Sequence, residues 1–404
     1  MHELTDGQRL RELRAIRGKN MRQIAGLAGI SASYYGRLER DEQPLNSRST
    51  ICALAAAFEV APSALTGQPS QSTDPAMAEA QATLPALRVA LVTTEFGKPA
   101  EGARRPVRQL VTETQQAIGY RTDCDFAALG RILPSLVTGL HTAVVQERGE
   151  ERVEAMQALI HTLVSASALM HAFSYSMEAY TASDRAVQVA TELGDGWTAV
   201  AKFSLAHALL PMGNDAMAHA YRIASESADV ARSLTGRIEG DPAIAAYGSL
   251  CLVSALTAAV TGRAAEADER LAAAAEVAKR AGDCSPTVAT FGPTNVLLYQ
   301  ASTALERGDY EESIRFGDSV NLAAITNPER AAKFCIDRGR ALAEVRGREA
   351  DAVAEFRKGE ALAPLRVRSN NFARATVTGL LNRVRREAVS HDLRGLAYRM
   401  GMTA

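Results

Sequence analysis

Residues 20–40 read NMRQIAGLAGISASYYGRLER, and this stretch decides the fold of the amino-terminal part of the chain. Asn20 is a favourable cap for a short helix that follows it directly. Gly29 then supplies a sharp turn, and Ser31 is a favourable cap for a second helix. The stretch therefore predicts two short helices, over 21–28 and 32–40, joined by a tight turn.

The second of these helices has two distinct faces. Tyr35 and Leu38 lie on one face at helical spacing, which predicts that they point into a core. The opposite face carries groups suited to contact with a partner, namely Ser33, Tyr34 and Arg37. We expect this polar face to be exposed.

Helical patterns flank the pair on both sides. Before it, the stretch 7–17 places apolar residues at three-residue steps between arginines, which predicts an amphipathic helix that Gly18 ends. After it, the stretch 49–58 predicts a further helix with Leu54 inward. The whole unit extends from Thr5 to Leu65.

A helix, a tight turn and a helix form the geometry in which the second helix enters the major groove of DNA. By chemistry, Arg37 suits a guanine or a phosphate, while Ser33 and Tyr34 reach base edges or backbone at short range. We expect Arg40 and Arg48, which flank the helix, to contact phosphates. The alternative for the arginines of the first helix is a solvated face, which is the favoured explanation for Arg9 and Arg11. A protein-docking module is the alternative for the whole unit.

The run Ala28-Gly29-Ile30-Ser31, followed by Arg37-Leu38-Glu39 and the helix over 49–58, resembles the XRE (Cro/C1-type repressor) family. The resemblance implies that Arg14 pairs with Glu39 and so ties the first helix to the third. Met21 departs from the family pattern, which often has a phosphate-binding glutamine there, so that contact is lost or passes to Arg22 or Gln23. The predicted DNA-contact set is Arg22, Gln23, Ser31, Ser33, Tyr34, Arg37 and Arg40.

One such unit reads only a few base pairs, and two copies placed one helical turn apart normally supply affinity and specificity. We therefore predict a homodimer that binds double-stranded DNA at a near-palindromic operator. The formal net charge of −1 means that DNA contact depends on a local surface and not on the whole chain.

The composition favours an all-α protein with at least two units. The chain has 404 residues, 47% of them hydrophobic but only 5% aromatic, and alanine dominates. The Pro- and Ser-rich stretch 67–77 predicts a linker, which leaves 1–66 as the helix-turn-helix domain and 78–404 as a helical domain. The polar start and the lack of an 18-residue apolar run predict a cytoplasmic protein without a membrane segment, and the five scattered cysteines predict reduced thiols.

The long carboxy-terminal region has the pattern of stacked helix pairs, an α-solenoid. In the clearest unit, from Phe334 to Pro364 with a turn at Gly347, Ala352 and Phe356 stand where a tetratricopeptide repeat places its small and aromatic residues. Weaker units turn at glycines 308, 262 and 213.

The first helix of each pair in such an array lines a concave inner surface. Counting from the turn glycines, we predict a ligand-binding set of Ser249, Leu252, Asn295, Leu298, Tyr299, Ser302, Phe334 and Asp337, with Leu256 beside it. An asparagine amide both donates to and accepts from a peptide backbone. The alternative is that Asn295 caps a helix that begins at Pro293-Thr294.

The fusion of an XRE-like unit to such repeats resembles the RRNPP quorum-sensing regulators and the helix-turn-helix/tetratricopeptide regulators of actinomycetes. The run Phe291-Gly292-Pro293-Thr294-Asn295-Val296 carries the second resemblance. It implies control of gene expression by an intracellular signalling peptide or other small ligand bound on the concave surface.

Three further patterns have competing explanations. The arginines between Arg366 and Met400 suit a second basic surface or, more economically, a closing helix of the array. The basic pair Arg104 and Arg105, in a loop predicted over 96–106, suits a solvated loop or an auxiliary DNA contact. The sequence has no phosphate loop, zinc-protease or nucleophile motif, and its seven histidines are dispersed, so we expect no enzyme, metal or cofactor. The alternative function is an interaction scaffold that recruits a partner protein.

Overall fold

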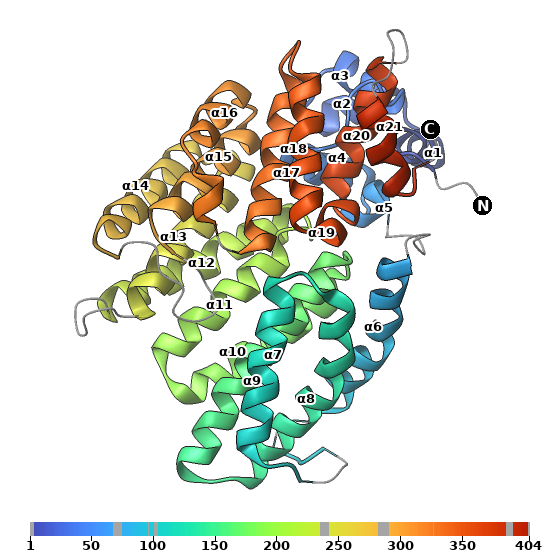
Figure 1. Cartoon of the computed structure of the whole chain (residues 1–404). Helices are drawn as coiled ribbons and strands as arrows, with labels where there is room; N and C mark the ends of the chain where they lie inside the picture. Colours follow the sequence, from blue (N-terminus) through green and yellow to red (C-terminus); the bar gives the residue numbers. More distant parts are fainter. Residues whose placement is uncertain are drawn as a thin grey trace.

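The computed structural model describes residues 4–67, 75–95, 97–100, 104–234, 242–281, 291–325, 327–384 and 391–402. Within these ranges the chain forms helices joined by turns and contains no strand, which confirms the all-α fold class. The helices divide into a small amino-terminal bundle and a long array of packed pairs (Figure 1).

The amino-terminal bundle, which we call the headpiece, contains α1 to α5. Their bounds are α1 Asp6–Ile16, α2 Met21–Leu27, α3 Ala32–Glu39, α4 Arg48–Phe58 and α5 Pro62–Thr66. Asn20 and Ser31 cap α2 and α3 as predicted, and Gly29 has a φ of 66° at the turn between them. Tyr35 and Leu38 point into the headpiece core, as their spacing indicated.

The array begins at α6, Pro75–Thr93, so the last three residues of the stretch predicted as a linker, 75–77, are helical. Residues 68–74 of that stretch lie outside the described residues, so the predicted linker stays a prediction. The next helices are α7 Val107–Thr122, α8 Phe126–Gln146, α9 Gly149–Ala172, α10 Ser176–Leu193, α11 Asp195–Leu209 and α12 Asn214–Leu234. By length and composition α8 and α9 suffice to cross a membrane, but here both pack in the hydrophobic core.

The second half of the array ends in a short carboxy-terminal bundle. Its helices are α13 Pro242–Val260, α14 Ala264–Ala281, α15 Pro293–Arg307, α16 Tyr310–Asp318, α17 Pro328–Glu344, α18 Glu349–Leu362, α19 Pro364–Arg368, α20 Asn371–Val384 and α21 His391–Arg399, with a 3-10 turn, η1, at Leu322–Ala324. From α7 onward, consecutive helices pack against each other, and alternate helices such as α11, α13, α15 and α17 also touch. This is the packing of a solenoid.

The predicted repeat positions lie where the helices of a pair meet. Ala352 and Phe356 are fully buried, and a Cβ at Gly339 of α17 would lie 3.0 Å from the Phe356 ring, so glycine permits this close contact. In the preceding pair, the Ser313 hydroxyl donates to the carbonyl of Ala301 at 2.8 Å. The four turn glycines all have positive φ. The local geometry of the predicted pairs is therefore present, while their membership of the tetratricopeptide family stays a prediction.

Most of the carboxy-terminal arginines that the structure describes form hydrogen bonds or ion pairs within the protein. Glu360 of α18 accepts from Arg368 at 2.8 Å and from Arg399 at 2.6 Å. Arg374 donates to the carbonyl of Met400, and Arg383 to that of Ala343 at 2.8 Å. These contacts favour the closing-helix explanation; Arg385 and Arg386 lie outside the described residues.

The loop arginines Arg104 and Arg105 are paired as well. Arg104 contacts Glu147 at 2.6 Å, and Arg105 forms an ion pair with Glu113. Both side chains fasten the loop between α6 and α7 to neighbouring helices. The structure therefore favours a structural explanation for this basic pair.

Candidate nucleic-acid interface

Helix α3 presents a polar face on the outside of the headpiece. Ser33, Arg37 and Arg40 are exposed, whereas Gly36 and Leu38 on the other side are buried. The Ser31 hydroxyl accepts from the backbone N–H of Tyr34 at 3.1 Å, which begins the helix. The amino end and outer face of α3 are thus open, as the insertion of a recognition helix into a DNA groove requires.

Helix α2 adds a second exposed edge beside α3. Arg22 is exposed, and within the described residues its guanidinium has no ion pair or hydrogen bond. Gln23 is exposed too, but its amide oxygen accepts from the N–H of Asn20 at 2.8 Å in a capping box. Met21 is 42% exposed, with its sulfur near Gly36 of α3. Of the two substitutes for the missing glutamine, Arg22 is the one whose side chain is available.

Tyr34 lies differently from its neighbours on α3. It is half-buried, and burial raises the pKa of its hydroxyl, while a hydrogen bond to Thr50 opposes the rise and the charge of Glu344 adds to it. The guanidinium of Arg37 lies 5.7 Å from the Tyr34 ring centroid. Tyr34 is therefore placed to orient Arg37 from the side, and its own contact with DNA stays a prediction.

A buried polar contact ties α1 to α3, as the family resemblance implied. The Arg14 guanidinium forms two bonds to the carboxylate of Glu39, at 2.5 and 3.2 Å, and the Tyr35 hydroxyl donates to the same carboxylate at 2.6 Å. Glu39 is only 4% exposed, so the bidentate pair satisfies a charge that would otherwise be costly to bury. This contact fixes the orientation of α3.

Arg40 and Arg48, which we expected at phosphates, have different surroundings. Arg40 is exposed and pairs with Glu42 at 2.9 Å, a contact that a phosphate can replace. Arg48 forms a salt bridge with Glu306 of α15, and its side chain is only 16% exposed. For Arg48 the expectation was wrong, because its guanidinium faces the array and not the solvent.

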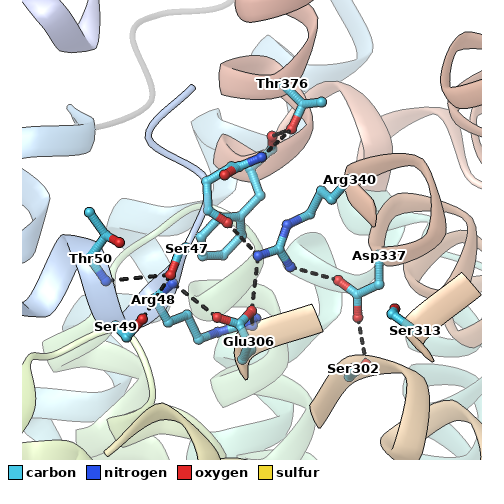
Figure 2. Close-up of polar contacts among 12 residues, drawn as sticks. Ser47, Arg48, Ser49, Thr50, Ser302, Glu306, Ser313, Asp337, Arg340 and Thr376 are labelled. Atoms are coloured by element: carbon cyan, nitrogen blue, oxygen red, sulfur yellow. Dashed lines mark hydrogen bonds and ion pairs between the residues drawn. The ribbon is translucent and has the colours of Figure 1, made fainter. Parts of the chain in front are cut away.

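Arg48 belongs to a buried network that joins the headpiece to the array (Figure 2). The carboxylate of Glu306 accepts from the backbone N–H of Arg48 at 3.0 Å and from the Arg340 guanidinium at 2.9 Å. Arg340 also donates to Asp337 at 2.9 Å and to the carbonyl of Asn46. Asp337 in turn accepts from the Ser302 hydroxyl at 2.7 Å. The network thus runs from α4 through α15 and α17.

The charges in this network depend on one another because its side chains are shielded from solvent. The side chains of Arg340 and Glu306 are 1% and 0% exposed. Burial alone would raise the pKa of Asp337, but Lys333 and Arg340 hold it well below its ordinary range. Likewise, Arg48 and Arg340 overcome the effect of burial and lower the pKa of Glu306. Removal of one partner would leave an uncompensated charge in the interface.

Further contacts surround this network. Glu344 of α17 accepts from Gln43 at 2.8 Å and from Asn46 at 3.2 Å. The Phe372 ring of α20 packs on the headpiece core and lies 4.8 and 4.4 Å from the guanidinium carbons of Arg48 and Arg340. Figure 1 shows the headpiece beside the last helices of the array. One side of the headpiece is therefore docked, while the outer face of α3 stays open.

The predicted ligand-binding residues lie in several different surroundings. Ser249, Leu252 and Leu256 on α13 are buried, as is Phe334 on α17. Ser302 and Asp337 belong to the docking network. Asn295 lies inside α15 and accepts from Arg330 at 2.8 Å, so it does not cap that helix.

Tyr299 and Leu298 complete the predicted set. Both are half-buried, and the Tyr299 hydroxyl lies 3.0 Å from Nε2 of His207. Since Nδ1 of His207 lies 3.0 Å from the carbonyl of Phe203, which can only accept, Nδ1 carries the proton, and Nε2 of the neutral ring accepts from Tyr299. The hydrogen bonds described above are thus internal to the protein, and the role of the set in ligand binding stays a prediction.

Comparison with known proteins agrees with the geometry of the headpiece. Residues 7–66 match a family model described as a helix-turn-helix domain. No curated protein matches the chain. The fold and this match define an all-α protein that carries a DNA-binding helix-turn-helix domain at its amino-terminal end.

Sequence reasoning missed the docking residues Asn46, Glu306 and Arg340. A signal for two of them was present, because Glu306 and Arg340 follow the predicted inward residues Ser302 and Asp337 by one helical turn. A charged side chain at such a position indicates a buried partner. The partner itself, Arg48, is 258 residues away from Glu306 in the chain, and local pattern gives no means of joining the two.

Proposed function

We propose that this protein is a transcriptional regulator that binds a near-palindromic DNA operator as a homodimer in the cytoplasm, without enzymatic activity. One observation carries the proposal. The outer face of α3, with Ser33 and Arg37, is open, while the opposite side of the same domain is anchored by Arg48 and Glu306. Because the headpiece is anchored, α3 has a defined orientation. The two α3 helices of a dimer need such an orientation to enter two successive half-sites.

We further propose that the array holds a peptide or other small ligand and that the ligand changes the geometry of DNA binding. The support is the docking interface, in which α15 and α17 hold the headpiece directly. A ligand that binds one of two arrangements of these helices more tightly would shift the equilibrium between the arrangements, and with it the position of α3. The size of the shift is set by the difference between the two affinities.

The test of DNA binding is selection from a randomised duplex library with the purified full-length protein, followed by footprinting at fixed salt. We expect an enriched near-palindrome whose half-site centres lie about 10 base pairs apart. The double variant Ser33→Ala/Arg37→Ala should lose enrichment, while Arg315→Ala, an exposed arginine of α16, should retain it. A lack of sequence enrichment by the wild-type protein would favour the interaction scaffold.

The test of the homodimer is sedimentation of the protein with and without the selected duplex. We expect two chains per operator. A single chain on a single half-site, with full affinity, would contradict the dimer and leave the DNA-binding proposal intact.

A further inference from the structure

A pocket of about 440 Å³ lies between the carboxyl end of α6 and the middle of α10. Its walls carry hydroxyl, amide and charged groups, from Thr94, Glu95, Tyr180, Thr181, Asp184, Arg185 and Gln188. The volume lies within the range of sites that bind small molecules. The pocket is distinct from the inner-surface residues that the sequence predicted for a ligand.

Arg185 is the cationic residue of the pocket lining, and its guanidinium is positioned by a hydrogen bond to an uncharged side chain. Its guanidinium donates to the hydroxyl of Thr94. Thr94 is 2% exposed and donates its own proton to the carbonyl of Ala90 at 3.0 Å, so its oxygen is fixed as an acceptor. The position of the guanidinium is therefore set before any ligand arrives.

Within the described residues, no carboxylate lies at ion-pair distance from Arg185. The acidic side chains of the pocket have other contacts: Asp184 accepts from Gln188 at 2.7 Å, and Glu95 pairs with Lys98. Partial burial lowers the pKa of Arg185, although Asp184 acts in the opposite direction. In contrast, the buried arginines Arg48 and Arg340 each have a carboxylate partner.

We propose that this pocket binds a small anion, with a carboxylate or phosphate group held by Arg185. A guanidinium offers parallel N–H donors that match both groups, and the partly dehydrated cation gains an ion pair that the protein does not supply. The polar walls suit an anion that also carries hydroxyl groups. As a regulatory ligand, this anion rests on the ligand response proposed above, whereas its binding does not depend on that response.

The pocket adjoins a helix that follows the headpiece in the chain, so a bound anion can affect the headpiece through this helix. Helix α6 is the first described helix after the headpiece. It contributes Val92 to the pocket, Thr94 directly follows its last residue, and α10 contributes Arg185. The two helices make few contacts besides the ion pair of Arg88 with Glu178 at 2.9 Å, since α6 packs mainly on α8. An anion between them would add a further link to the first described helix after the DNA-binding domain.

The experiment measures the melting temperature of the full-length protein with inorganic phosphate or with malate, against sodium chloride at equal ionic strength. We expect a rise of about 2 °C at saturation with at least one of the two anions. Phosphate alone or malate alone would identify the preferred group. Arg185→Met should abolish the rise, and Arg185→Lys, which keeps the charge, should retain part of it.

The matched control is Arg131→Met, which changes an exposed arginine of α8 that pairs with Glu79 of α6. It should show the same anion-dependent rise as the wild type. Without anion, Arg185→Met should melt no lower than the wild type, because it removes a cation that has no carboxylate partner. No rise in the wild type, or an equal rise in Arg185→Met, overturns the proposal. Because these measurements contain no DNA, their failure is separate from a failure of operator selection.

Discussion

The two sides of the headpiece use the same residue type in opposite ways. On the outer side, Arg22 and Arg37 are exposed and have no carboxylate partner among the described residues. On the docked side, Arg48 contacts Glu306, and Arg340 of the array reaches back to Asn46. The difference teaches that the charge of an arginine does not indicate its role. The presence of a buried carboxylate separates an arginine that anchors the domain from one that is available to DNA.

The largest expected effect comes from removal of the carboxylate on the docked side. Glu306→Gln leaves Arg48 and Arg340 with an uncompensated charge, because Asp337 alone remains in the network. We expect a loss of about 3–5 kcal/mol in the free energy of unfolding, measured by denaturant titration of the transition that includes the headpiece.

The control for this prediction is Glu312→Gln, which breaks an exposed ion pair with Arg315 on α16. Its unfolding midpoint should match that of the wild type. If Glu306→Gln behaves like the control, the buried network does not hold the headpiece and the comparison of the two sides fails.

The sequence predicts the two sides of the headpiece unequally well, and the reason is physical. Capping at Asn20 and Ser31 and the inward spacing of Tyr35 and Leu38 are local signals, and the structure confirms them. The docked side depends on a meeting of α4 with α15 and α17, which no periodicity records. Arg48 was therefore assigned to phosphate, although its partner is a carboxylate distant in the chain.

The same limit applies to the array. Turn glycines and the small residue Ala352 gave the positions of helix pairs, because each pair is a local unit. The inward register did not show which inward residues stay open to solvent. Ser249 and Leu252 point inward and are fully buried, since α13 is covered by neighbouring helices.

The second prediction compares the two sides of the headpiece through one substitution on each side. Arg37→Ala should weaken operator binding by about 5- to 150-fold and leave the melting temperature unchanged, because the side chain has no carboxylate partner within the protein. Arg48→Ala should do the reverse, with a lower melting temperature and a smaller change in affinity. Mobility shifts and calorimetry on both variants test these opposite effects on affinity and melting temperature, and equal effects on affinity would contradict the prediction.

The third prediction concerns acid. As the pH falls, stability should be lost first through buried histidines in the interior beside the docked side. Burial, with Lys333 and Arg48, lowers the pKa of His207 to about 4, and burial with Arg366 lowers that of His171 to about 3. An unfolded histidine titrates near 6.5, so the unfolded chain takes up protons first. Stability contributed by the neutral rings is present above pH 6.5 and is lost as the pH falls toward 4.

The measurement is the melting temperature between pH 7 and pH 4.5. His207→Gln should flatten its fall, while His391→Asn, at an exposed position of α21, should not. A steeper fall in His207→Gln would show that the ring is charged in the folded protein. Below that range, the low pKa of Asp337 in the folded protein adds a further loss, because the unfolded chain takes up this proton first, at about pH 4.

The smallest effect tests the outer side by adding a contact. Met21 is partly exposed at the start of α2, where the family resemblance expects a glutamine that binds phosphate. Met21→Gln should raise operator affinity by about two- to tenfold, the value of one hydrogen bond. Since an amide carries no charge, the slope of affinity against salt should stay the same, whereas an added lysine would steepen it. The control is Ile16→Gln, an equally apolar and more exposed position on α1, which should leave affinity unchanged. Equal gains from both variants would mean that polarity alone, and not the position beside α3, improves binding.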